Sequence, residues 1–242
     1  MRLQIVLLGL AMSCDGAHRD RGPAGDESFV PSNAATFGDF GSDDLTVAPP
    51  DGAFDTDHDC TPTSALGACT ALTDACVCRA NTISIGTLHV TGPRMLVLLA
   101  ARELTVGTLL DASGHGSTPG PGAIAGYSGS AADALTNAAG GSFATPGAAD
   151  RSGSDSIGAT YGDPSLVPLA GGMIGQDGTG GSGGGGGGGV QLSAGEQLEI
   201  DGAIEVDGGG AAGGTGSWAS SGGGGGGAGG GFGGGAGGAG GL

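Results

Sequence analysis

The sequence predicts an all-β protein, organised as a short parallel β-helix or solenoid of about three coils with long glycine-rich low-complexity insertions. Residues 96–114 alternate apolar and other residues, and the same pattern returns in residues 190–208. A third copy lies upstream, where residues 83–88 align with residues 104–109. Each copy ends in glycine, which is typical of a strand that turns a corner. A small antiparallel β-sheet is the alternative.

Alternation with a period of two places every second side chain on the same face of an extended chain. The matched positions are Leu96/Val190, Leu98/Leu192, Ala100/Ala194, Leu104/Leu198 and Val106/Ile200. We therefore expect Leu98, Leu104, Val106, Leu192, Leu198 and Ile200 to share one core. Gly86, Gly107 and Gly202 fall between short strands, where a tight corner needs conformational freedom or has no room for a Cβ atom.

The first thirteen residues have the pattern of an export signal. The apolar run behind Arg2 is about ten residues long, and a membrane span needs about twenty. The run ends in Leu10-Ala11-Met12-Ser13-Cys14, which resembles the lipobox of bacterial lipoproteins except that alanine stands where leucine is most usual. The resemblance implies removal of residues 1–13, lipid on Cys14 and a lipid-anchored location in the cell envelope, at the outer membrane or cell surface. The alternative is an ordinary secretory signal cleaved near Ala17.

The cysteine count agrees with export. The chain has five cysteines, and setting Cys14 aside leaves an even set clustered in residues 60–80: Cys60, Cys69, Cys76 and Cys78. In an oxidising compartment such a set indicates two disulfides, and the sequence leaves all three pairings open. A zinc site is the alternative, but the spacing lacks the paired C-x2-C arrangement. We expect residues 60–80 to form a cysteine-rich cap on the first coil.

Residues 14–59 are expected to form an acidic, disordered tether. They are rich in Asp, Gly, Pro, Ser and Ala, and such a segment cannot bury enough apolar surface to offset the entropy of ordering. Its end carries a candidate calcium site, because Asp55, Asp57 and Asp59 alternate like the first ligands of a calcium loop. Cys60 stands where such a loop needs glycine, and Leu66 stands where it needs an acid, so a solvated linker is expected instead.

The remaining chain divides into coils and glycine-rich segments. Residues 81–114 form the first two coils, 115–189 an insertion, 190–208 the third coil and 209–242 a tail. Poly-glycine is either disordered or packed as extended left-handed helices with main-chain hydrogen bonds, as in glycine-rich antifreeze and fibre proteins. We expect disorder, because glycine loses most entropy on ordering. The tail stops at Leu242, where another coil would begin, so the uncovered third coil is expected to self-associate.

Strands separated by poly-glycine, behind a lipobox, resemble the glycine-rich, repeat-bearing surface lipoproteins of bacteria. The resemblance covers residues 83–242. It implies a structural or adhesive role in the cell envelope, with the membrane as partner through Cys14 and cell-surface or matrix polysaccharide as a candidate ligand. It implies no catalytic residues and no cofactor.

Other function classes find less support in the sequence. A net charge of −17 and a pI near 4.1 argue against nucleic-acid binding. Polysaccharide enzymes on β-helices use paired acids, and the acids on the expected strands of this chain are Asp111, Glu199, Asp201, Glu205 and Asp207. The last four of these alternate outward, as acids on a solvated face also do. His89 and His115 have no evident partner in the sequence. We therefore expect no enzyme, and a carbohydrate- or calcium-binding module is the alternative to the structural role.

Overall fold

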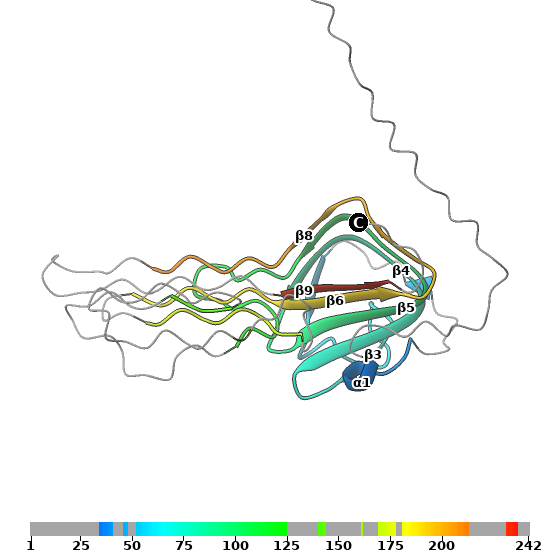
Figure 1. The fold of residues 1–242 in the computed structure, drawn as a ribbon, viewed down its shortest axis with the longest axis horizontal. Helices are drawn as coiled ribbons and strands as arrows, with labels where there is room; N and C mark the ends of the chain where they lie inside the picture. Colours follow the sequence, from blue (N-terminus) through cyan, green and yellow to red (C-terminus); the bar gives the residue numbers. More distant parts are fainter. Residues whose placement is uncertain are drawn as a thin grey trace, which may run out of the picture.

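The computed structural model describes residues 34–40, 46–47, 52–124, 140–143, 161, 169–177, 181–212 and 231–236. This part of the chain is all-β, as the sequence predicted. It contains one nine-stranded sheet and a helix of four residues, α1 (Ala34–Phe37). Figure 1 shows the strands gathered in one body, with a set of extended segments running out from one end of it.

Two long neighbouring strands, β4 (Ala75–Thr91) and β5 (Met95–Asp111), form the centre of the sheet. Three short strands pair with β4: β1 (Thr46–Val47), β2 (Gly52–Asp55) and β3 (Ala68–Ala71). Three more pair with β5: β6 (Gly189–Ala194), β7 (Gln197–Ile200) and β8 (Ala203–Glu205). The strand β9 (Gly231–Ala236) then pairs with β6.

The register of β5 with β6, β7 and β8 is the one that the sequence repeat predicted. Leu96 lies beside Val190, Leu104 beside Leu198, and the same offset holds from one end of β5 to the other. Pairing is parallel between all described strands except β3 and β4, which are antiparallel. Between β4 and β5 the register shifts twice, so β5 carries extra residues at its bends. Between these two strands the predicted alignment holds from Ile83 to Ile85 and is wrong beyond it, where Leu88 pairs with Leu110. The described sheet is therefore predominantly parallel, and a small antiparallel sheet is ruled out for it.

One hydrophobic core unites residues from both ends of each long strand. It includes Cys76 and Leu88 of β4, which lie far apart along that strand, so the sheet curves around a shared interior. Of the six residues expected in this core, Leu98, Leu104, Val106 and Leu192 are fully buried, and Leu198 is partly buried. The prediction was wrong for Ile200, which is 41% exposed. Alternation gives the direction of a side chain but does not supply the neighbouring strand that would cover it.

The outer face of the sheet is also covered along the apolar run at the start of β5. Met95, Val97 and Leu99 belong to a second buried cluster with Phe37 of α1 and Leu169. The guanidinium of Arg79 donates hydrogen bonds to the main-chain carbonyls of Phe37 and Asp39, which fastens the C-terminal end of α1 to β4. Five consecutive apolar residues can be accommodated here because both faces of the strand are protected from water.

The segment expected to be a disordered tether is partly ordered. Its described residues include α1, β1 and β2. Val47 lies beside Ile83 and Phe54 beside Val90 in the parallel ladder, and both Val47 and Phe54 are buried. Composition over the whole segment hides these single apolar residues, which gain their burial from a strand much further along the chain. Residues 14–33 lie outside the described residues.

The cysteine-rich segment forms two disulfides, Cys60–Cys76 and Cys69–Cys78. The antiparallel pairing of β3 with β4 places Cys69 directly opposite Cys78, which decides one pairing and leaves the other two cysteines to each other. All four cysteines are buried in the main core. The segment lines the interior at the start of the sheet, and its last residues, 75–80, are the beginning of β4.

The glycine tract at residues 183–189 is buried and ordered, so the prediction of disorder is wrong for it. Four other segments surround it: 112–116, 118–122, 171–175 and 207–212. These five segments are called the glycine bundle below, and Figure 1 shows them running side by side from one end of the sheet, in green, yellow and orange. Hydrogen bonds between main-chain groups hold the bundle together and offset the entropy that glycine loses on ordering.

The hydrogen bonds of the bundle follow a period of three residues. Residues 185 and 188 bond to segment 112–116, and residues 186 and 189 bond to residues 120–121. Residues 184 and 187 bond to segment 172–175, and residue 185 together with Ser182, just before the tract, bonds to segment 209–212. Three residues per turn is the period of the extended left-handed helix. A Cβ atom on Gly183, Gly185 or Gly186 would lie within 2.2 Å of a neighbouring carbonyl oxygen. Glycine is required here by the close approach of the backbones.

Candidate functional site

The most developed polar cluster centres on Asp111, the last residue of β5. One carboxylate oxygen, Oδ2, lies 3.0 Å from Nδ1 of His89 and 3.1 Å from Nε2 of His115. The other, Oδ1, accepts a hydrogen bond of 2.9 Å from the backbone N–H of Ser113. The carboxylate is buried, whereas both imidazoles are more than half exposed. We call Asp111, His89 and His115 the histidine cluster.

Two opposed effects set the pKa of Asp111. Burial acts to raise it, while the hydrogen bonds from Ser113, His89 and His115 act to lower it. The hydrogen bonds together outweigh burial, so the pKa of Asp111 lies below its usual value. The carboxylate is therefore an anion at neutral pH, and each histidine nitrogen that faces it is the protonated, donating one.

The sequence missed this cluster because its members meet through the sheet. His89 is paired with Asp111 by the register of β4 and β5, and His115 lies four residues beyond Asp111 and contacts the same carboxylate oxygen. The geometry does not form a nucleophilic triad, in which histidine must stand between the acid and the hydroxyl. Here the acid stands in the centre, and the hydroxyl of Ser113 accepts a hydrogen bond from the backbone N–H of Asp207. The cluster therefore holds the ends of three segments together.

The acidic loop at residues 55–59 is held by hydrogen bonds between its own residues. Asp55 Oδ1 accepts the backbone N–H of Asp57 at 2.7 Å, and Asp59 Oδ2 accepts the backbone N–H of Asp55 at 2.8 Å. Asp57 pairs with Arg94. The hydrogen bond from Asp57 chiefly, with further ones from His58, lowers the pKa of Asp55 against the effect of burial. The structure thus gives all three proposed calcium ligands protein partners and does not gather them around one point.

Among the described residues, only one group of His, Cys, Asp and Glu side chains is compact enough to hold a metal ion. It consists of Cys69, Cys76 and Cys78, whose sulfur atoms all lie within 4.8 Å of one another. A cysteine binds a metal ion as a free thiolate, whereas these three sulfur atoms are bonded in disulfides. The arrangement therefore favours the disulfide interpretation over zinc.

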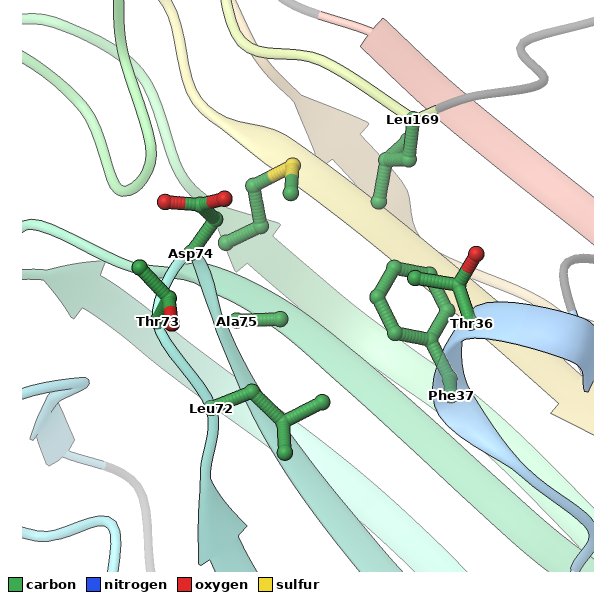
Figure 2. Close-up of a pocket in the computed structure, with 8 residues that line it drawn as sticks. Thr36, Phe37, Leu72, Thr73, Asp74, Ala75 and Leu169 are labelled. Carbon is green, nitrogen blue, oxygen red and sulfur yellow. The ribbon is translucent and has the colours of Figure 1, made fainter.

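Two neighbouring cavities lie over the outer face of the sheet, with volumes of about 290 and 370 Å³. Both are lined by Asp74, Met95 and Leu169. Figure 2 shows Phe37 and Leu169 converging on the first cavity, with Leu72 on another side and Asp74 at its rim. Asp74 is the only charged residue among the described residues that line either cavity.

The acids of the last strands point outward as the alternation predicted. Glu199, Asp201, Glu205 and Asp207 are exposed, and Glu205 lies directly across from Asp111 in the ladder. Arg102 is beside Glu196, with 3.2 Å between Nε and Oε2. These side chains form an acidic, solvated face.

Comparisons of the chain with known protein families, with curated proteins and with solved structures find no match. Among the described residues, no helix is long and apolar enough to cross a membrane. Cys14 lies outside the described residues.

Proposed function

We propose that the protein is a non-catalytic, lipid-anchored scaffold of the bacterial cell envelope with a structural or adhesive role. The observation that carries this proposal is the glycine bundle, in which a buried tract is held by main-chain hydrogen bonds to four neighbouring segments. Such an element builds an extended, rigid shape without presenting reactive side chains. The polar side chains of the histidine cluster and of the acidic loop likewise make hydrogen bonds within the protein.

The sheet is, in this proposal, a short β-solenoid of about three coils. Support comes from the constant parallel register of β5 with β6, β7 and β8, and from one core shared by distant parts of each long strand. In a solenoid each coil covers the apolar interior of the next, so an extended body can grow without a large globular core. That form suits a protein that holds a surface away from a membrane.

Export and anchoring are supported by chemistry rather than by the fold. Two buried disulfides persist in an oxidising compartment outside the cytosol. The apolar run that ends at Cys14 resembles a lipoprotein signal. The anchoring test compares the full chain with Cys14→Ser in a bacterial host fed a clickable fatty acid. We expect label and membrane partitioning for the full chain, and neither for the variant; unchanged partitioning of Cys14→Ser would exclude the anchor.

The structural role is tested by displaying the full chain on cells. Cell attachment to polysaccharide-coated surfaces is measured for the full chain and for Gly186→Ala, which crowds the bundle. We expect the full chain to increase attachment and the variant to lose most of that gain. Equal attachment by both would show that the bundle contributes nothing to the role.

A calcium- or carbohydrate-binding module is the second candidate. It is favoured by one observation, the exposed acids of the last strands, Glu199, Asp201, Glu205 and Asp207. These acids could recruit calcium or hydrogen-bond to sugar hydroxyl groups. The melting temperature in calcium chloride, compared with sodium chloride at equal ionic strength, tests whether these acids bind calcium.

A further inference from the structure

Among the described strands, β7 and β8 are paired along one side only. The strand β6 lies between β5 and β9, and its Val190, Leu192 and Ala194 are fully buried. In the described part of the chain, β7 and β8 pair with β5 alone. We call the free side of β7 and β8 the open edge.

Side-chain burial shows that the open edge is exposed to solvent. Leu104 and Val106 of β5 are fully buried, and the residues that stack on them are Leu198 and Ile200. Leu198 is only partly buried, and Ile200 is 41% exposed. Further along the edge, Ile204 and Val206 are also only partly buried. The edge therefore offers unpaired strand backbone next to a row of partly covered apolar side chains.

Acidic side chains alternate with that apolar row. Glu199 and Glu205 point outward from the open edge and are exposed. Residues 152–242 contain no Lys, Arg or His, so this part of the molecule carries no positive side chain to balance them. Like charges placed directly opposite each other on neighbouring strands are destabilising. Pairing of this edge with the same edge of a second copy would bring carboxylates together, which argues against self-association at this place.

We propose that the open edge binds an extended segment of another protein in which apolar residues alternate with lysine or arginine. The segment adds a strand parallel to β7 and β8, and main-chain hydrogen bonds provide the common part of the affinity. Its apolar residues cover Leu198, Ile200 and Ile204, while its basic residues lie opposite Glu199 and Glu205. The proposed binding at the open edge gives the scaffold a partner, and so it rests on the proposed function. It does not depend on lipid attachment at Cys14.

The probe for the test is a short fluorescein-labelled peptide that alternates valine and lysine, with two glycines where the edge bends at residues 201–202. Fluorescence anisotropy is measured with the full chain at low salt. We expect saturable binding that weakens as salt is added, because exposed charges are screened. Ile200→Lys places a charge on the apolar row, and Glu199→Lys reverses a carboxylate; we expect each to weaken binding about ten-fold or more.

Two controls separate this surface from general charge attraction. A peptide with glutamate in place of lysine keeps the apolar pattern, and we expect no binding. Asp39→Lys makes the same charge change as Glu199→Lys at an exposed position away from the edge, and we expect binding to be unchanged. Circular dichroism and a melting curve for each variant confirm the fold, and Glu199→Lys, on a solvated side chain, keeps the test valid if Ile200→Lys fails to fold.

The proposal is overturned if the glutamate peptide binds as tightly as the lysine peptide, or if Asp39→Lys and Glu199→Lys weaken binding equally. It is also overturned if light scattering finds a dimer of the full chain that Ile200→Lys abolishes, because the occupant would then be a second copy. Loss of the edge interaction would leave the result of the Cys14→Ser experiment untouched, so the two failures are distinguishable.

Discussion

Asp111 joins the end of β4 to the loop that follows β5. Its buried carboxylate accepts hydrogen bonds from His89, His115 and the backbone of Ser113. We predict that Asp111→Asn lowers the free energy of unfolding by about 2 kcal/mol at neutral pH, because hydrogen bonds to a charged group are lost. Urea unfolding measures the difference. Glu205→Gln is the matched control, since it neutralises the exposed carboxylate directly opposite and should change stability by less than about 0.5 kcal/mol.

The same carboxylate predicts a pH dependence. The pKa of Asp111 is lower in the folded protein than the usual aspartate value of about 3.9 expected in the unfolded chain. A lowered folded pKa means that the stabilisation is complete above the unfolded pKa and disappears as the pH falls through the folded pKa. The stability difference between wild type and Asp111→Asn should therefore shrink as the pH drops below about 4. A difference that stays constant down to pH 2 would contradict this assignment.

The alternation of apolar residues makes a second prediction at this scale. Leu104 is fully buried in the main core, and Glu199 is exposed on β7. We predict that Leu104→Asp destabilises the fold by about 4 kcal/mol or more, because an unpaired charge enters an apolar interior. Glu199→Ala should be nearly silent. Thermal unfolding of both variants is the measurement, and equal tolerance would show that the inward and outward faces have been interchanged.

The pairing of β5 with β6 and β7 was predictable, whereas the side-chain contacts between β4 and β5 and the disulfide pairing were not. A period of two in residues 96–106 and 190–200 gave the register because the two stretches share the same alternation. The contact of His89 with Asp111 depends on how β4 is aligned with β5, and that alignment shifts twice along the strand. Similarly, the disulfide pairing followed only once β3 was known to lie antiparallel to β4.

At the scale of elements, the glycine bundle allows a test with a matched substitution. A Cβ atom on Gly186 would lie 2.1 Å from the carbonyl oxygen of Gly172, whereas one on Gly210 meets nothing within 4 Å. Replacing either glycine by alanine has a similar effect on the unfolded chain. We predict that Gly186→Ala lowers stability by about 1–3 kcal/mol through crowding, and that Gly210→Ala does not destabilise.

Hydrogen exchange gives the local measurement for this pair of variants. The amides of Gly172, Gly175 and Gly185 donate to carbonyls within the bundle and should be protected in the wild-type protein. Gly186→Ala should lose this protection, while Gly210→Ala should keep it. Rapid exchange of these amides in the wild type would restore the original expectation that the tract is disordered.

The two elements that the sequence did not predict share a physical cause. The strands β1 and β2 have few apolar residues, and the glycine bundle has almost none, so a local reading of composition finds nothing that can fold. Each is ordered by main-chain pairing with a segment far along the chain: β1 and β2 with β4, and the tract with segments on either side of it. Main-chain hydrogen bonds can be made by almost any residue type, so they leave no pattern in the sequence. In the glycine bundle, the only sign of them in the sequence is the glycine that close backbone contacts require.

At the scale of the whole molecule, charge repulsion and ion pairing oppose each other. The chain has 24 acidic residues against 7 Lys and Arg, a net charge of −17. The arginine–carboxylate pairs of the described chain are Arg94–Asp57 and Arg102–Glu196. An exposed ion pair contributes about 0–1 kcal/mol, so two such pairs cannot balance the mutual repulsion of the remaining acids. Repulsion should dominate the salt dependence.

We therefore predict that the melting temperature of the full chain rises as sodium chloride is raised from about 10 to about 300 mM, because the screening length falls from about 30 Å toward 6 Å. A fall in melting temperature would show that the ion pairs outweigh the repulsion.

Calcium chloride at equal ionic strength tests whether the acids bind calcium specifically. The acidic loop is closed by its own hydrogen bonds, so calcium should match sodium. A larger rise with calcium, lost in Glu199→Ala or in Asp57→Ala, would favour the calcium-binding module and identify which acids hold the ion.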